Sequence, residues 1–187
     1  MPAEWAIEVM KRAPFITVSF TRADGTAYGL PMSMACTDDR TWYFHCALEG
    51  EKLDAISTHP EVCLSAVTKC QPTVDPNVSQ SERKANSFAI PSRRNVNEVK
   101  DGSFTLQYQS AVAFGRAEIV TSDEKKILGL RVISQRFLPH HMDAFDASIA
   151  RSLERTAVVR ITLTAPPTGK RKQYDPQGEE MKFGRME

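Results

Sequence analysis

The sequence contains no run of about 18 apolar residues, the length that a helix needs to cross a membrane. Its charges nearly cancel, with 24 lysines and arginines against 23 aspartates and glutamates. It therefore lacks the concentrated positive field with which proteins bind nucleic acids or membrane surfaces. The N-terminus also lacks the charged and then apolar pattern of a secretory signal peptide. These absences predict a cytoplasmic protein that binds neither nucleic acid nor membranes.

Cysteine is scarce, and its four occurrences show no Cys-x-x-Cys pairing. Cys36, Cys46 and Cys63 lie in apolar strand patterns, and the fourth cysteine is Cys70. This arrangement is typical of reduced, buried thiols and not of a zinc site or a disulfide framework. We therefore expect no metal site.

The 187 residues suffice for one domain with a hydrophobic core, and their periodicity indicates short elements. Helical patterns cover 3–12, the stretch from Gly50 to Pro60, the stretch from Ser122 to Pro139, and 143–154. Alternating patterns indicate strands at 15–21, 27–36, 40–46, 61–69, 104–121 and 156–163. Tight turns at 24–25 and 37–40 predict that the first three strands form a meander. A mainly antiparallel sheet closed into one small barrel is the economical arrangement.

Two segments show no such periodicity. Residues 70–102 contain three prolines and many polar residues, so we interpret them as a long insertion that is partly mobile. Such a loop either covers a functional site or is plainly disordered, and the sequence leaves both open. Residues 166–187 are expected to form a mostly solvated C-terminal tail, which leaves 1–165 as the folded domain.

Residues 27–36 separate large side chains from small ones. The small face consists of Ala27, Gly29, Pro31, Ser33 and Ala35. Such a face lets a flat object approach the backbone, either a neighbouring helix or a planar cofactor ring. Pro31 cannot donate to a strand ladder, so we expect the strand to lie at an edge or to be bulged there.

The stretch from 40 to 59 is a strand that turns at Gly50 into a helix. Helix N-terminal N–H groups together with Lys52 in the first turn indicate a phosphate site. His45 is the last polar residue of the strand and is expected near the same site. The alternative is that the helix start is merely solvated and that His45 is a hydrogen-bonded wall residue.

The strand pattern at 104–121 carries large apolar side chains on one face and alanines on the other, with Gly115 as the expected bend. Its apolar residues, taken with those of the other strands, exceed what one barrel interior can hold. Some of them should therefore be buried between subunits.

Three segments resemble the FMN-binding split-barrel superfamily, also called pyridoxamine 5′-phosphate oxidase-like, and within it the 5-nitroimidazole-resistance (Nim-type) branch. The segments are Asp24-Gly25-x-x-Tyr28-x-x-Pro31, Tyr43-Phe44-His45-Cys46-Ala47-x-x-Gly50-x-Lys52 continuing to Cys63, and Tyr108-Gln109-Ser110-Ala111-Val112-x-Phe114-Gly115. The resemblance covers about residues 3–165, and the second segment is the most specific part of it.

The resemblance implies a mainly β protein, an antiparallel split β-barrel with three or so short helices. It also implies a homodimer with two FMN sites at the subunit interface. The residues that it places around the cofactor are Pro31, Met32, Ser33, Met34, His45, Cys46, Ala47, Gly50, Lys52, Gln109 and Ser110. His45 is the candidate catalytic residue.

The implied function is an FMN-dependent oxidoreductase that takes electrons from NAD(P)H and passes them to a small acceptor such as a nitroaromatic. The C-terminal segment lacks an Arg-Leu-x-Pro ending, which argues against pyridoxal phosphate synthesis. The insertion is longer than expected of the Nim-type branch, so the substrate side stays open. The alternatives are a non-enzymatic flavin- or haem-binding protein, with His45 as a wall residue or axial ligand, and a cofactor-free dimeric scaffold.

Overall fold

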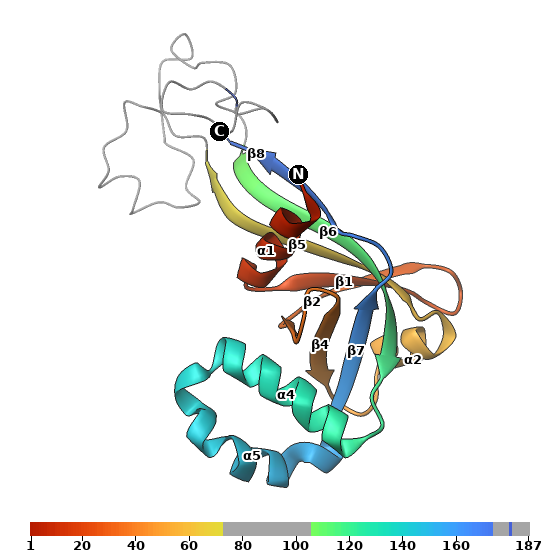
Figure 1. The fold of residues 1–187 in the computed structure, drawn as a ribbon. Coiled ribbons are helices and arrows are strands. Elements are labelled where there is room, and N and C mark those ends of the chain that lie inside the picture. Colours follow the sequence, from red (N-terminus) through yellow and green to blue (C-terminus); the bar gives the residue numbers. More distant parts are fainter. Residues whose placement is uncertain (73–105, 174–179, 181–187) are drawn as a thin grey trace, which may run out of the picture.

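The computed structural model describes residues 1–72, 106–173 and 180. These contain eight strands and four α-helices, arranged as a curled sheet with peripheral helices (Figure 1). The elements are α1 (Ala3–Arg12), β1 (Ile16–Thr21), β2 (Ala27–Met32), β3 (Ala35–Cys36), β4 (Thr41–Cys46), α2 (Glu51–Thr58), β5 (Glu61–Pro72), β6 (Leu106–Ile119), α4 (Asp123–Phe137), α5 (Phe145–Ser152), β7 (Ala157–Leu163) and β8 (Thr168–Lys172). Short 3-10 helices at Pro139–Ala144 and Leu153–Arg155 flank α5. The mainly β split-barrel prediction is confirmed.

The chain between Ala27 and Cys36 closes the barrel. The sheet has the order β2-β1-β5-β6-β7-β4-β3, with β8 paired to β6. β2 and β3 thus lie at opposite ends of the sheet, although only Ser33 and Met34 separate them in sequence. Three Cα–Cα links span at most about 11 Å, so the sheet has to curl until its two ends meet. The two hairpins of the expected meander are present, because β1 pairs with β2 and β3 pairs with β4, but its middle strand is divided between the two ends of the sheet. The edge position of Pro31 is confirmed.

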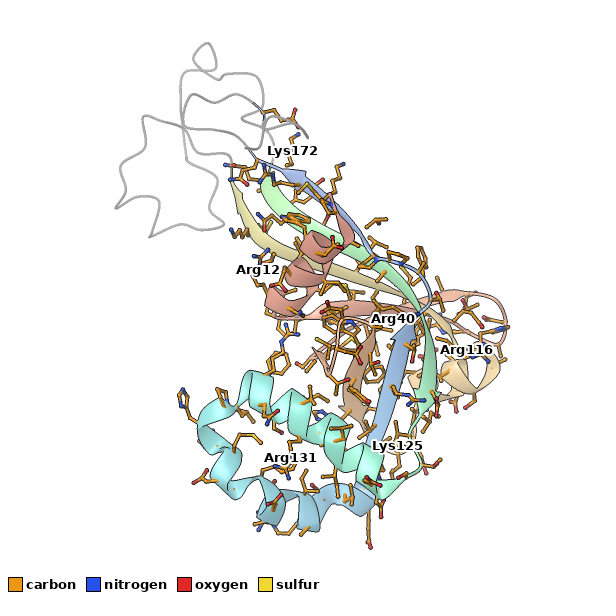
Figure 2. The ribbon with its side chains drawn as sticks, in the orientation of Figure 1. Arg12, Arg40, Arg116, Lys125, Arg131 and Lys172 are labelled. Carbon is orange, nitrogen blue, oxygen red and sulfur yellow. The ribbon has the colours of Figure 1, made fainter. Side chains whose placement is uncertain are left out.

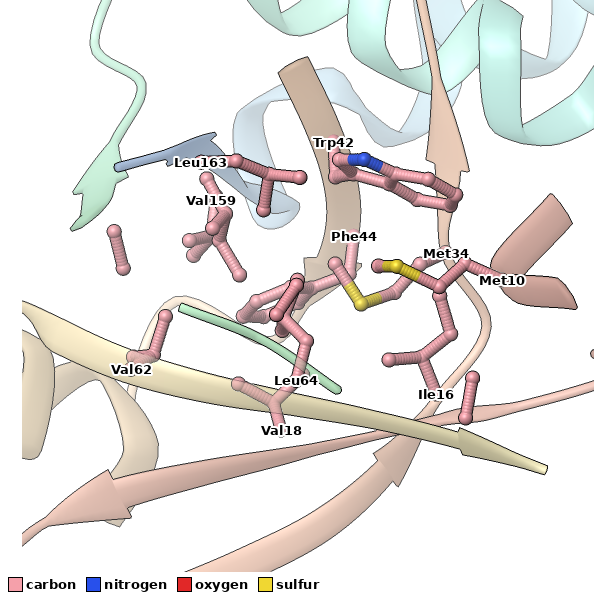
Figure 3. Packing of buried hydrophobic residues seen from close by; sticks show 14 of the residues in the cluster. Met10, Ile16, Val18, Met34, Trp42, Phe44, Val62, Leu64, Val159 and Leu163 are labelled. Atoms are coloured by element: carbon pink, nitrogen blue, oxygen red, sulfur yellow. The ribbon is translucent and has the colours of Figure 1, made fainter. Parts of the chain in front are cut away.

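The main hydrophobic core fills the barrel interior, with apolar side chains from α1 and α2 (Figure 3). Trp42 and Phe44 of β4 are fully buried there. Other fully buried members are Met10, Ile16, Val18, Met34, Leu64, Ile161 and Leu163. Alternation along each strand sends the strand residues of this set inward, as the sequence patterns predicted.

A second apolar cluster covers the outer face of β4 and β7, beneath α4 and α5. Val158 belongs to this outer cluster and Ile161 to the barrel core, so β7 is buried on both faces. α4 approaches closely at Gly129, where an added Cβ would lie 2.8 Å from the Tyr43 ring and 2.9 Å from Val158. Only glycine fits that contact.

The structure also shows the surroundings of Gly115 in β6 and of Ser122 before α4. Gly115 lies within β6 and pairs with both Val62 and Leu163. A Cβ there would lie 2.7 Å from Ile161, so close packing requires glycine at this position. Ser122 is the N-cap residue of α4, where its carbonyl accepts from the Lys126 amide but its side chain makes no cap hydrogen bond.

The segment boundaries also need correction. Residues 168–172 of the expected tail form β8 and pair with β6, so the ordered chain extends beyond residue 165. The first three residues of the expected insertion belong to β5. The rest of that insertion, residues 73–102, falls outside the described residues. Cys36, Cys46 and Cys63 are half-buried and Cys70 is exposed, so the thiols are less buried than expected.

Within the described parts of the chain, no helix has the length and apolar character needed to traverse a lipid bilayer.

Candidate functional site

One face of the sheet, here named the open face, is the outward side of β2, β1, β5 and β6. The register places Thr17 beside Pro31 and Ser65, and Val67 beside Ser110. The open face comprises Thr17, Ser19, Ala27, Gly29, Pro31, Cys63, Ser65, Val67, Ser110, Val112 and Phe114. All of these side chains are exposed or half-buried, in contrast to their inward-facing neighbours.

The open face combines small residues with exposed large apolar ones. An added Cβ at Gly29 would meet nothing nearer than 3.7 Å, so no packing inside this chain requires glycine there. Val67 is 48% exposed and Phe114 is 59% exposed. Exposed apolar side chains on a smooth sheet indicate a surface that another group covers. Because Gly29 and Pro31 are exposed, none of the described helices is the flat object that the small residues were expected to admit.

The N-terminus of α2 presents a candidate anion site. Gly50 has φ +130°, and the Nζ of Lys52 lies 3.9 Å from the position of a Cβ on Gly50, so the lysine folds back across the helix start. Glu51 in the same turn would repel an anion, but Arg22 forms an ion pair with it. The remaining first-turn N–H groups and Lys52 therefore favour an anion here.

His45 and Cys46 lie on opposite faces at the end of β4. The His45 imidazole is exposed on the side of the outer helices, and partial desolvation lowers its pKa. Burial raises the pKa of the Cys46 thiol, and the nearby charge of Lys52 offsets part of that rise. Lys52 thus acts on Cys46, and no charged group contributes to the pKa shift of His45. The structure groups Cys46 with Gly50 and Lys52, with His45 on the other face.

The sheet separates the two predicted residues of β6. Gln109 is 6% exposed and its Oε1 accepts a hydrogen bond of 3.3 Å from Nη2 of Arg12 on α1. Ser110 belongs to the open face, where its Oγ donates to the Lys170 carbonyl at 3.4 Å. Only Ser110 therefore shares a face with Pro31.

The other predicted residues divide similarly. Pro31 and Ser33 are exposed, Met32 is half-buried, and Ala47 is exposed in the loop before α2. Met34 is 1% exposed and packs in the barrel core, so its side chain is not on the open face.

Arg22 is a site residue that the sequence patterns did not single out. Besides its ion pair with Glu51, its guanidinium lies 4.7 Å from the centre of the Tyr28 ring. It therefore ties α2 to the β1–β2 hairpin. Its partner Glu51 is 29 residues away, so no local pattern could reveal the contact.

Comparisons with solved structures identify proteins of the same fold. A putative 5-nitroimidazole antibiotic resistance protein from Bacteroides thetaiotaomicron shares 16% identity, with 89% of this chain and 81% of that chain covered and a TM-score of 0.62. The flavocytochrome Anf3 from Azotobacter vinelandii shares 17%, covering 96% and 69%, with a TM-score of 0.67. The FAD and haem binding protein from Mycobacterium smegmatis shares 18%, covering 90% and 70%, with a TM-score of 0.66.

A search of curated protein sequences found no match. The family model described as pyridoxamine 5′-phosphate oxidase matches residues 4–165, which is most of the chain and includes every site residue discussed above. This chain therefore belongs to the pyridoxamine 5′-phosphate oxidase family.

Proposed function

We propose that this protein binds a flavin, which we expect to be FMN, and that it acts as an oxidoreductase on a small molecule. The observation that carries the proposal is the open face, where exposed small residues adjoin exposed apolar ones on one smooth side of the sheet. Family membership and the flavin-binding titles of two proteins of the same fold support it.

The residues present fit FMN at both of its ends. A planar, largely apolar ring suits a surface on which Ala27 and Gly29 keep the backbone accessible. A phosphate suits the N-terminus of α2, where Gly50 has no side chain and Lys52 folds across the helix start. Arg22 supports this arrangement by neutralising Glu51.

A bound flavin supplies hydride and electron transfer, here from NAD(P)H to a small acceptor such as a nitroaromatic. The contribution of the protein is binding and orientation. Lys52 and the α2 N-terminus hold the phosphate, and the open face positions the ring. His45 is the candidate to deliver a proton to an acceptor, because desolvation lowers its pKa and so makes its protonated form a stronger acid.

The proposal includes a homodimer. Val67 and Phe114 project from the open face into solvent in the single chain, and a second copy placed against that face would bury them. A partner there would also exclude water from a flavin ring, which a flat face alone cannot do.

A second candidate is a haem protein, favoured by the words flavocytochrome and haem in the titles of two proteins of the same fold. The absorption spectrum of the purified protein decides between the two. FMN predicts flavin bands and release of FMN on denaturation, and NAD(P)H should bleach those bands. A Soret band would establish the haem alternative, and a colourless protein that takes up neither cofactor would refute both.

A further inference from the structure

The side of the sheet that faces α1 carries polar side chains that the proposed function does not use. This group, here named the arginine cluster, consists of Arg12, Gln109 and Arg171. Gln109 of β6 and Arg171 of β8 are direct partners across the ladder, so their side chains leave the same face of the sheet. Arg12 reaches the same place from α1, because its Nη2 donates to Gln109 Oε1. Figure 2 shows Arg12 at the end of α1 and Lys172, the residue after Arg171, at the end of β8.

The packing of α1 determines which face Arg171 occupies. Gly169 lies two residues before Arg171 in β8 and therefore on the same face. An added Cβ at Gly169 would lie 2.6 Å from the Trp5 ring, so α1 packs directly on this side. Lys170 and Lys172 alternate with Arg171 and belong to the opposite side. The arginine cluster thus lies on the α1 side, across the sheet from Ser110 and the open face.

Two of the three nitrogens of the Arg171 guanidinium lack hydrogen-bond acceptors. Its Nε and Nη2 atoms are both buried and neither has a partner. In the described chain, Arg171 and Arg12 take part in no ion pair. A desolvated guanidinium without an acceptor is unfavourable. Nε and Nη2 are also the two donors that lie side by side on a guanidinium and bind a carboxylate or phosphate in a bidentate manner.

A strained piece of backbone adjoins the cluster. The pairing of β5 with β6 shifts between Thr68 and Gln71, and Thr68 is the partner of Gln109. Within this bulge Lys69 has φ +50°, a left-handed conformation that is uncommon for a residue other than glycine. Bulges and strained residues of this kind concentrate at ligand sites.

We propose that the arginine cluster binds an oxyanion, the carboxylate or phosphate group of a small molecule. Arg171 donates the side-on pair of hydrogen bonds through Nε and Nη2, and Arg12 contributes the second positive charge. The bound anion supplies the acceptors that Arg171 lacks. This site is distinct from the α2 N-terminus, because it lies on the α1 side of β6.

Calorimetric titration with inorganic phosphate, and separately with acetate, tests the proposal at constant ionic strength. The two titrations distinguish a phosphate from a carboxylate ligand. Arg171→Met should abolish saturable binding. Arg171→Lys keeps the positive charge but loses the paired Nε and Nη2 donors. It should therefore raise the dissociation constant tenfold or more. The matched control Lys172→Met removes a like charge from the other face of the same strand and should leave the dissociation constant within twofold.

The unliganded variant provides a second measurement. Arg171→Met removes two buried nitrogens that have no hydrogen-bond partner, so without added anion it should unfold at the same temperature as the wild type or higher. A lower unfolding temperature would mean that Arg171 already has partners, and would overturn the proposal. So would wild-type protein that binds neither anion, equal weakening by Lys172→Met, or anion binding that disappears when the protein is loaded with flavin.

Discussion

The guanidinium of Arg136, on α4, donates a hydrogen bond of 2.6 Å to the carbonyl of Met34, in the two-residue link between β2 and β3. The same side chain donates to the carbonyls of Met10 and Ala13 at the end of α1, at 3.3 and 2.6 Å. These carbonyls accept no hydrogen bond within α1, because they belong to the last turn of the helix and to the residue that follows it. Arg136 therefore joins the outer helical layer to α1 and to the segment where the barrel closes.

Arg136→Met should destabilise the fold, because it leaves buried carbonyls without donors. We expect a loss of about 2–4 kcal/mol in the free energy of unfolding, from roughly 1–3 kcal/mol per unsatisfied group. Urea denaturation measures it. Arg131→Met on the same helix is the control (Figure 2), because within the described residues Arg131 makes an exposed ion pair with Asp146 and a contact with Phe145. That control should cost no more than about 1 kcal/mol. Equal losses for both variants would contradict the bridging role of Arg136.

Lys52→Ala should weaken FMN binding. The change removes a charge-assisted hydrogen bond of roughly 1.5–3 kcal/mol, which corresponds to about one to two decades in the dissociation constant. Riboflavin has no phosphate and should bind the variant and the wild type alike. Fluorescence titration with both ligands measures this, with the exposed Lys125→Ala as control (Figure 2). An equal loss for riboflavin would show that Lys52 acts on the ring or on folding.

Phe114→Asp should separate the proposed homodimer into monomers. The side chain is 59% exposed in the single chain, and a carboxylate buried in an interface would be strongly unfavourable. Leu138→Asp is the matched control, because Leu138 is 55% exposed but lies after α4, away from the open face. Size-exclusion chromatography with light scattering reports the mass. A monomeric wild type with cofactor bound, or a dimeric Phe114→Asp, would refute the interface.

Stability should depend on pH through His45. Desolvation lowers its pKa in the folded state below the ordinary value of 6.5, so between the two pKa values the unfolded chain binds more protons. The free energy of unfolding should therefore fall as the pH drops through this window. His45→Gln should flatten that dependence, as measured by denaturation between about pH 5 and 7.5. The exposed His141→Gln is the control, and an unchanged slope in His45→Gln would contradict the desolvated environment.

The role of His45 in turnover needs its own measurement. If His45 delivers a proton to the acceptor, His45→Gln should keep flavin binding and flavin reduction but slow electron delivery by roughly 100-fold. A wall residue would instead lose flavin without a change in rate per bound flavin. Stopped-flow reduction by NAD(P)H, followed by reoxidation with a nitroaromatic, separates the two steps. Unchanged turnover at full flavin occupancy would remove His45 from the mechanism.

The sequence by itself determined the elements and their faces. Alternation in β4 and β7, the Asp-Gly turn and the proline stops are local signals, because side-chain direction and backbone geometry depend on near neighbours. These signals placed the small face of β2, the α2 N-terminus and Pro31 correctly.

Only the tertiary structure decided which faces are covered. Alternation shows that Gln109 and Ser110 point in opposite directions, but it does not show that α1 covers Gln109 whereas Ser110 is on the open face. The division of 27–36 between the two ends of the sheet and the contact of Arg136 with Met34 join residues far apart in sequence. Such contacts follow from the burial of apolar faces and of unsatisfied backbone groups, which depends on the whole assembly of elements and not on any local pattern.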